Sequence, residues 1–148
     1  MSEKRIALRL DLPPKPLWIS SDRHALRMVF GQLVKNAGTV SPQGGSVLVK
    51  AQLEGSDSDQ DYVLVQVADS GSGIAPQDLL NVFSPQSGDH PIKGLAKSGP
   101  EISRMKVLIE ALGGRTWVDS EPGNGATFSV LLPVKALVES GNGRGGWA

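Results

Sequence analysis

Apolar residues alternate with polar or small residues in five stretches of the chain, and this is the period of a β-strand. The stretches are residues 6–12, 47–53, 63–69, 116–120 and 127–132. The first should be half-buried, and it ends at Pro13 and Pro14 because proline cannot donate a ladder hydrogen bond. Residues 54–61 are polar and predict a hairpin loop between the second and third strands. A glycine-rich turn at residues 121–125 should join the last two strands.

Two longer stretches place apolar residues at three-and-four spacing, the pattern of an amphipathic helix. The first follows Ser20-Ser21-Asp22, whose side chains suit an N-cap, and should end near Asn36. The second runs over residues 102–112 and is closed by Gly113.

The segment between the third strand and the second long helix is less regular. Pro76 can start a short helix that carries the apolar residues up to Phe83. Residues 84–100 then lose all periodicity. A segment of that length without a pattern, inside a compact domain, predicts a functional or mobile loop.

Each long helix has a single apolar face, so both should pack on one side of the sheet. We therefore expect an α+β fold, a two-layer sandwich with a mixed, mainly antiparallel sheet and helices on one face. The length of 148 residues suits one core. The expected domain covers residues 1–134, and residues 135–148 form a Gly-rich C-terminal tail.

Composition narrows the classes of partner. The chain has 15 Lys plus Arg and 15 Asp plus Glu, so its formal charge of +0 argues against capture of nucleic acid. Cysteine is absent, which removes disulfides and thiolate metal sites. No apolar run approaches the ~20 residues that cross a bilayer, and the charged start is unlike a signal peptide. We expect a cytoplasmic domain without direct membrane insertion, monomeric in isolation.

A single carboxylate, Asp69, closes the third expected strand and is followed by Gly71 and Gly73. A carboxylate at the end of a buried strand needs a donor, which a ligand can supply. Two phosphate-binding patterns fail in this chain. Pro76 stands where a dinucleotide fingerprint needs its third glycine, and Pro100-Glu101 replaces the Lys-Ser/Thr of a P-loop. The aspartates of residues 54–61 lack the EF-hand pattern, and His24 and His90 show no triad arrangement.

Several short motifs, in order, resemble those of one known family. They are Val29-Phe-Gly-Gln-Leu-Val-Lys-Asn-Ala37, Asp69-Ser-Gly-Ser-Gly-Ile74, Val82-Phe-Ser-Pro85, Leu108-Ile-Glu-Ala-Leu-Gly-Gly114 and Val118-Asp-Ser-Glu-Pro-Gly-Asn-Gly-Ala-Thr-Phe128. From about Ile6 to Pro133 the chain resembles the Bergerat-fold (GHKL) ATPases, and among them the ATP-binding domain of sensor histidine kinases.

The resemblance implies roles for individual residues. Asp69 would accept a hydrogen bond from the adenine amino group, with Thr127 near the same edge. Asn36 would ligate the Mg²⁺ that bridges the phosphates of ATP, a metal that needs few protein ligands when phosphates supply the rest. The irregular loop, residues 84–100, would be the ATP lid. The other residues expected at the nucleotide are Gly71, Gly73, Ile74, Lys97 and Gly99.

The chain also departs from the family pattern. Gln32 occupies the position of the catalytic base, and an amide cannot take a proton as a carboxylate can. Residues 97–102 stand where the second glycine box belongs and retain only Gly99 from it. Glu101 adds a negative charge near the expected phosphates.

The implied function is that of a protein histidine kinase catalytic domain. It would use Mg-ATP to phosphorylate a histidine on a separate dimerisation domain, with a response regulator as the further partner. Two alternatives remain open at the sequence level. One is a degenerate relative that acts as a regulatory or protein-interaction module with weak or no nucleotide binding, and the other is a serine kinase of the anti-sigma type.

Overall fold

The computed structural model describes residues 5–14, 22–55, 61–84, 92–93, 95 and 99–134. The expected C-terminal tail, residues 135–148, lies outside this part of the chain, as do Lys97 and most of the expected lid. Within the described residues, no helix is long and apolar enough to cross a membrane.

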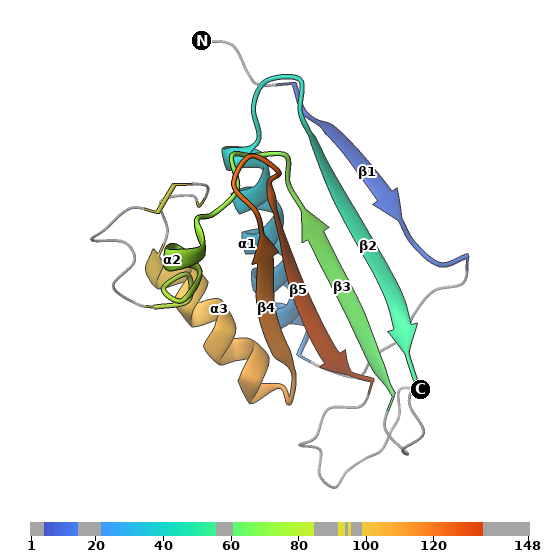
Figure 1. The fold of residues 1–148 in the computed structure, drawn as a ribbon. Coiled ribbons are helices and arrows are strands. Elements are labelled where there is room, and N and C mark those ends of the chain that lie inside the picture. Colours follow the sequence, from blue (N-terminus) through green and yellow to red (C-terminus); the bar gives the residue numbers. More distant parts are fainter. Residues whose placement is uncertain are drawn as a thin grey trace, which may run out of the picture.

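The described part of the chain contains five strands and three helices (Figure 1). They are β1 (Ala7–Asp11), α1 (Arg23–Val40), β2 (Ser46–Glu54), β3 (Tyr62–Ala68), α2 (Pro76–Leu79), α3 (Gly99–Ala111), β4 (Arg115–Ser120) and β5 (Ala126–Pro133). The five expected strands and the two expected long helices are all confirmed.

The strands form one mixed sheet in the order β1-β2-β3-β5-β4. Among these five strands, β1 and β2 pair in parallel, and α1 makes the crossover between them. The other three pairings are antiparallel. The mixed, mainly antiparallel sheet expected from the sequence is therefore confirmed, and β5 lies between β3 and β4.

The core lies between the sheet and the two long helices. Every second residue of β5, from Ala126 to Leu132, is at most 3% exposed on the helix side. These residues pack with apolar side chains of α1 and α3, such as Leu33 and Ile109. The two-layer arrangement with both helices on one face follows from this alternation (Figure 1).

The edge strand β1 differs from its expected burial. All five of its residues are exposed, and the side chains of Leu8 and Leu10 are 59% and 60% exposed. The expectation of a half-buried strand was wrong. Leu8 and Leu10 pair with Val47 and Val49 on the helix side, but β1 is the outermost strand and lies at the margin of the helix layer.

The helix ends also differ from their expected positions. The first helix continues to Val40, with Ser41 as its C-cap, so Asn36 lies inside the helix and is not a cap. At the other end, Asp22 is the N-cap, and its carboxylate accepts from the backbone N–H groups of His24 and Ala25. The short α2 ends at Leu79 and is followed by turns, and α3 begins at Gly99 rather than at residue 102.

Candidate functional site

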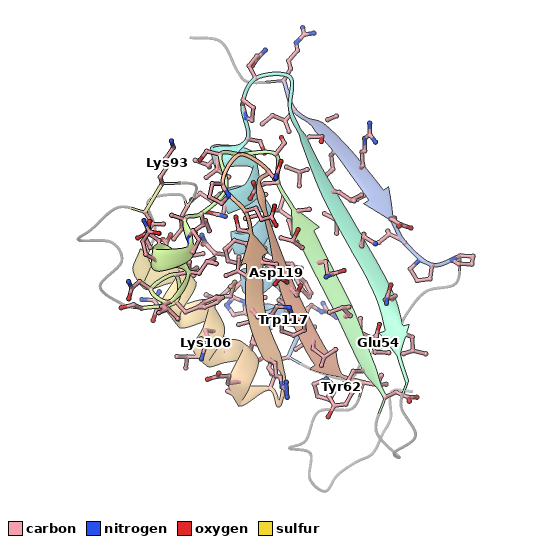
Figure 2. The ribbon with its side chains drawn as sticks, in the orientation of Figure 1. Glu54, Tyr62, Lys93, Lys106, Trp117 and Asp119 are labelled. Atoms are coloured by element: carbon pink, nitrogen blue, oxygen red, sulfur yellow. The ribbon has the colours of Figure 1, made fainter. Side chains whose placement is uncertain are left out.

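The candidate site lies at one end of the sheet, where β3 ends, α1 ends and β4 turns into β5 (Figure 1). Glu54 and Tyr62, labelled in Figure 2, pair at the opposite end of the β2–β3 hairpin. We call residues 69–74 the Asp69 loop and residues 121–125 the β4–β5 turn. These two segments are more than 45 residues apart in sequence and pack against each other.

Asp69 follows the last residue of β3 and keeps the side-chain direction of Val67, toward the helices. It is 8% exposed. Its Oδ1 accepts hydrogen bonds from the backbone N–H of Gly71, at 2.8 Å, and from that of Ala126, at 3.2 Å. Within the described residues, Oδ2 accepts no hydrogen bond. One carboxylate oxygen is thus fixed by the fold and the other is available to a donor.

The burial of Asp69 changes its acidity. Removal from water disfavours the charged form and raises the pKa of this carboxyl above its ordinary value. The N–H groups of Gly71 and Ala126 counter only part of that rise. An ionised Asp69 therefore gains from an added hydrogen-bond donor more than an exposed carboxylate would.

Glycine is required where the loop and the turn meet. Gly73 has φ +80° and Gly125 has φ +74°, a backbone conformation that favours glycine. A Cβ at Gly73 would overlap the carbonyl oxygen of Glu121, and one at Gly125 would overlap that of Asp69. These glycines allow the two segments to touch, so their close approach is to the protein's own backbone.

Serine hydroxyls connect the Asp69 loop to its other neighbour, the end of α1. Ser41, the C-cap of α1, accepts from the backbone N–H of Ser70 at 3.1 Å. The hydroxyl of Ser70 in turn accepts from the N–H of Ser46, the first residue of β2, at 2.9 Å. The loop is therefore held from two sides, by the β4–β5 turn and by the end of α1.

Thr127 lies on the other face of the sheet from Asp69. It pairs with Ala68, whereas the backbone N–H of Asp69 donates to the carbonyl of Ala126 at 2.9 Å. Side chains alternate along a strand, so Thr127 shares the outer face with Ser129, whose hydroxyl accepts from the Gln66 amide. A shift of one residue along a strand changes faces, so the Thr127 side chain lies on the face opposite to that of Asp69. Its expected place near the same edge of the adenine stays a prediction.

Asn36 and Ile74 are both enclosed by the protein. The Asn36 side chain is 1% exposed and lies one helical turn before Val40, whose carbonyl oxygen would be 2.8 Å from a Cβ at Gly71. This brings Asn36 to the same end of the fold as Asp69. Ile74 is 0% exposed, and its side chain belongs to the core.

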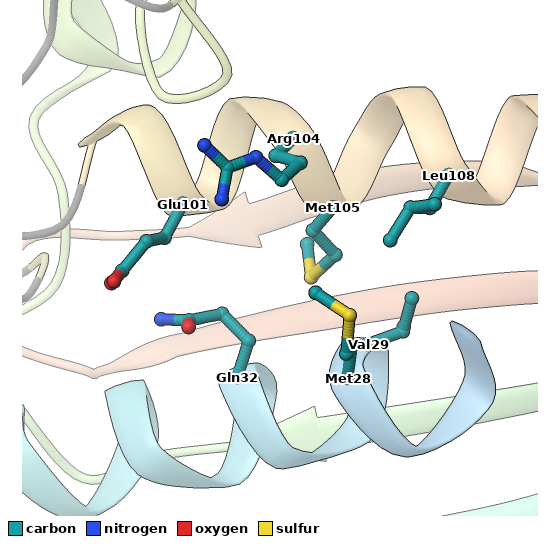
Figure 3. A pocket seen from close by; sticks show the side chains of 7 residues that line it. All are labelled: Met28, Val29, Gln32, Glu101, Arg104, Met105 and Leu108. Carbon is teal, nitrogen blue, oxygen red and sulfur yellow. The ribbon is translucent and has the colours of Figure 1, made fainter. Parts of the chain in front are cut away.

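A small open pocket lies between α1 and α3 (Figure 3). Figure 3 shows the amide of Gln32 directed toward the carboxylate of Glu101, with Arg104 beside it. The three polar groups share a pocket whose other walls are apolar. Its lining residues are Met28, Val29, Gln32, Glu101, Arg104, Met105 and Leu108.

Sequence reasoning found Asp69 and its glycines but missed the groups that hold them. The backbone N–H of Ala126 and the hydroxyls of Ser41 and Ser70 carry no chemical signature of their own. The alternation of side chains along β5 was the available signal. Ala126 lies two residues before Phe128 and therefore on the same, buried face.

The chemistry of these groups suits a base with an amino donor. A buried carboxylate with one free oxygen recognises an N–H group, and the amide oxygen of an asparagine suits Mg²⁺ when phosphates complete the shell. The pocket beside Gln32 is lined by the anionic Glu101 and the cationic Arg104. Its fit to a triphosphate therefore depends on whether Arg104 offsets the charge of Glu101.

Comparison with known proteins extends over most of the chain. Residues 21–136 match the family described as histidine kinase-, DNA gyrase B- and HSP90-like ATPases. The chain is 35% identical over 131 residues to the alginate biosynthesis sensor protein KinB of Pseudomonas aeruginosa, covering 88% of this chain and 21% of that protein. It is 36% identical over 130 residues to the histidine protein kinase DivJ of Caulobacter vibrioides, covering 87% of this chain and 21% of that one. The chain thus spans about a fifth of the length of these relatives.

Solved structures share the fold. A mycobacterial sensor histidine kinase, MprB, superposes with a TM-score of 0.71 at 23% identity, over 88% of this chain and 85% of that one. Full-length ShkA in complex with AMPPNP gives a TM-score of 0.69 at 26% identity, over 86% of this chain and 25% of that one. Together with the match over residues 21–136, these findings show that the chain belongs to the histidine kinase-, DNA gyrase B- and HSP90-like ATPase family.

Proposed function

We propose that this domain binds Mg-ATP as the catalytic domain of a two-component sensor histidine kinase, and supplies it for phosphorylation of a histidine on a separate dimerisation domain. The named relatives are a sensor protein and a histidine protein kinase, and a structural neighbour was solved with an ATP analogue. They favour this function over a serine kinase of the anti-sigma type. A response regulator would be the further partner, and the domain would work in the cytoplasm.

The observation that carries the proposal is the Asp69 carboxylate. Oδ1 of Asp69 accepts hydrogen bonds from two backbone N–H groups. Burial disfavours the charged carboxylate, so a further hydrogen-bond donor would stabilise it. Oδ2 can accept that hydrogen bond from the adenine amino group. Gly71 and Gly73 shape the loop around it. Ile74 and the core beneath would form the floor under the base.

The phosphates would lie between α1 and the start of α3. Asn36 would supply an amide oxygen to Mg²⁺, and the metal would help to neutralise the charge of the phosphates. The first turn of the helix that begins at Gly99 would offer backbone N–H groups to an anion, other than at Pro100. Lys97, outside the described residues, would approach the same phosphates. Gln32 occupies the position of the base and can orient a group by hydrogen bonding, but it cannot take its proton.

Calorimetric titration with Mg-ATP and Mg-ADP tests the proposal. We expect binding to the wild-type domain and a loss of about tenfold to a hundredfold in Asp69→Asn, because a hydrogen bond to a charged group contributes about 1.5–3 kcal/mol. Asp119→Asn is the matched control. Asp119 is exposed on β4 and pairs with Thr127 on the outer face (Figure 2), so its replacement should leave the affinity unchanged.

An absence of heat at millimolar nucleotide, with an unfolding temperature that nucleotide does not move, would contradict the proposal. A ligand that binds the native state must stabilise it. That result would favour the alternative, a degenerate domain with a regulatory or protein-interaction role.

A further inference from the structure

One hydroxyl joins the two segments that surround Asp69. Ser120, the last residue of β4, accepts a hydrogen bond from the backbone N–H of Ile74 at 2.8 Å. The same Oγ donates to the carbonyl oxygen of Gly125 at 2.7 Å. A hydroxyl has one proton to donate, and here that proton is directed at the β4–β5 turn while a lone pair serves the Asp69 loop.

Both segments carry a donor to Asp69. The Asp69 loop supplies the N–H of Gly71, and the residue that follows Gly125 supplies the N–H of Ala126. The second of these bonds is the longer, at 3.2 Å, and it exists only while the turn stays against the loop. The backbone N–H of Gly123, which donates to the carbonyl of Ser72 at 2.6 Å, is a further bond across the same contact.

We propose that Ser120 is a positioning residue for nucleotide recognition: its hydroxyl keeps the Ala126 N–H on Oδ1 of Asp69, and so leaves Oδ2 directed to the base. The inference rests on the proposed function for its effect on affinity. Its structural half, that Ser120 sets the bond between Ala126 and Asp69, concerns the ligand-free protein alone.

Another hydroxyl of the same strand provides a matched control. Thr116 Oγ1 donates to the carbonyl of Ser129 at 2.8 Å, so it also bridges β4 and β5. That bridge lies four residues before Ser120, away from the Asp69 loop. Thr116→Val therefore removes one hydroxyl and one inter-strand hydrogen bond of the same kind.

The experiment compares Ser120→Ala, Ser120→Thr and Thr116→Val with the wild type. Affinity for Mg-ADP is measured by calorimetry, and the amide proton shift of Ala126 is measured by NMR without ligand. We expect Ser120→Ala to bind about fivefold to tenfold more weakly, the size of one lost hydrogen bond, and to move the Ala126 amide proton upfield. Ser120→Thr, which keeps a hydroxyl, should restore both, and Thr116→Val should change neither. If Ser120→Ala does not fold, Ser120→Cys is used in its place, because the thiol is similar in size to the hydroxyl and is a weaker donor.

Wild-type affinity and an unmoved Ala126 resonance in Ser120→Ala would overturn the inference, and so would equal effects in Thr116→Val. If the wild type binds no nucleotide, the proposed function fails by itself. The Ala126 shift then decides whether Ser120 positions Asp69: a shift confined to Ser120→Ala supports it, and an unchanged shift overturns it.

Discussion

Asp69 places an ionisable side chain at a position where the fold alone would favour a neutral one. Its Oδ1 accepts from two backbone N–H groups, and the amide oxygen of an asparagine could accept the same two bonds. Burial raises the pKa of the carboxyl above the ordinary 3.8. An ionised carboxylate therefore costs stability in the empty protein, and a ligand that donates a hydrogen bond to it would offset that cost.

The raised pKa of Asp69 gives its contribution to stability a definite sign. Between the unfolded and the folded pKa, the folded protein binds more protons, so its free energy of unfolding falls as pH rises through the folded value. Asp69→Asn removes this loss. We expect the difference in unfolding temperature, mutant minus wild type, to be more positive at about pH 7 than at about pH 4. Thermal melts without ligand at the two pH values measure it, and a difference of opposite sign would show that the fold stabilises the ionised carboxylate.

At the scale of elements, the β4–β5 turn combines closure of the sheet with support of the site. Two of its glycines have positive φ, but only one is crowded. A Cβ at Gly123 would meet nothing within 4 Å, whereas one at Gly125 would overlap the backbone carbonyl of Asp69. A substitution at Gly123 therefore tests the cost of backbone strain alone, and one at Gly125 tests strain together with close packing.

We expect Gly123→Ala to cost about 1–2 kcal/mol, the penalty of a left-handed conformation for an L-residue. Gly125→Ala should cost about 1–3 kcal/mol more, because the turn must also move away from Asp69. Urea unfolding of the two variants gives the comparison. An equal loss of unfolding free energy in the two variants would mean that the turn can move away from Asp69 at residue 125 without further cost.

The elements themselves could be predicted from the sequence, because local periodicity is enough for them. The alternation from Val63 to Val67 and the three-and-four spacing in α1 and α3 each identify an element within its own residues. The face on which Thr127 lies could not be predicted, because it depends on the register with β3, which is set by a neighbour about 60 residues away in sequence. The Ser120 hydroxyl bonds join distant segments, so no local pattern indicates them.

At the scale of the whole molecule, the central strands of the sheet are well supported by their neighbours, and the edge strand β1 is weakly supported. The central strands β3 and β5 pair on both sides and face the helices. β1 pairs with β2 alone, and all five of its residues are exposed. The sequence showed its alternation, but only the strand order shows that it is an edge.

Amide hydrogen exchange should show this difference. Segments with few buried contacts open with little free energy, so we expect the β1 amides that pair with β2 to exchange at least about a hundredfold faster than those of β3 and β5. Similar protection in all three strands would show that β1 unfolds only together with the core.

The serine pair between α1 and the Asp69 loop also makes the site mechanically sensitive. Ser41 ends the helix, Ser70 follows the carboxylate, and the backbone N–H of Ser70 donates to the Ser41 hydroxyl at 3.1 Å. Ser70 is in turn tied to the start of β2. A displacement of this helix end cannot occur without breaking that bond or carrying the loop along. Tension applied to α1 would therefore reach the carboxylate through the Ser41 hydroxyl as well as through the contact of Val40 with Gly71.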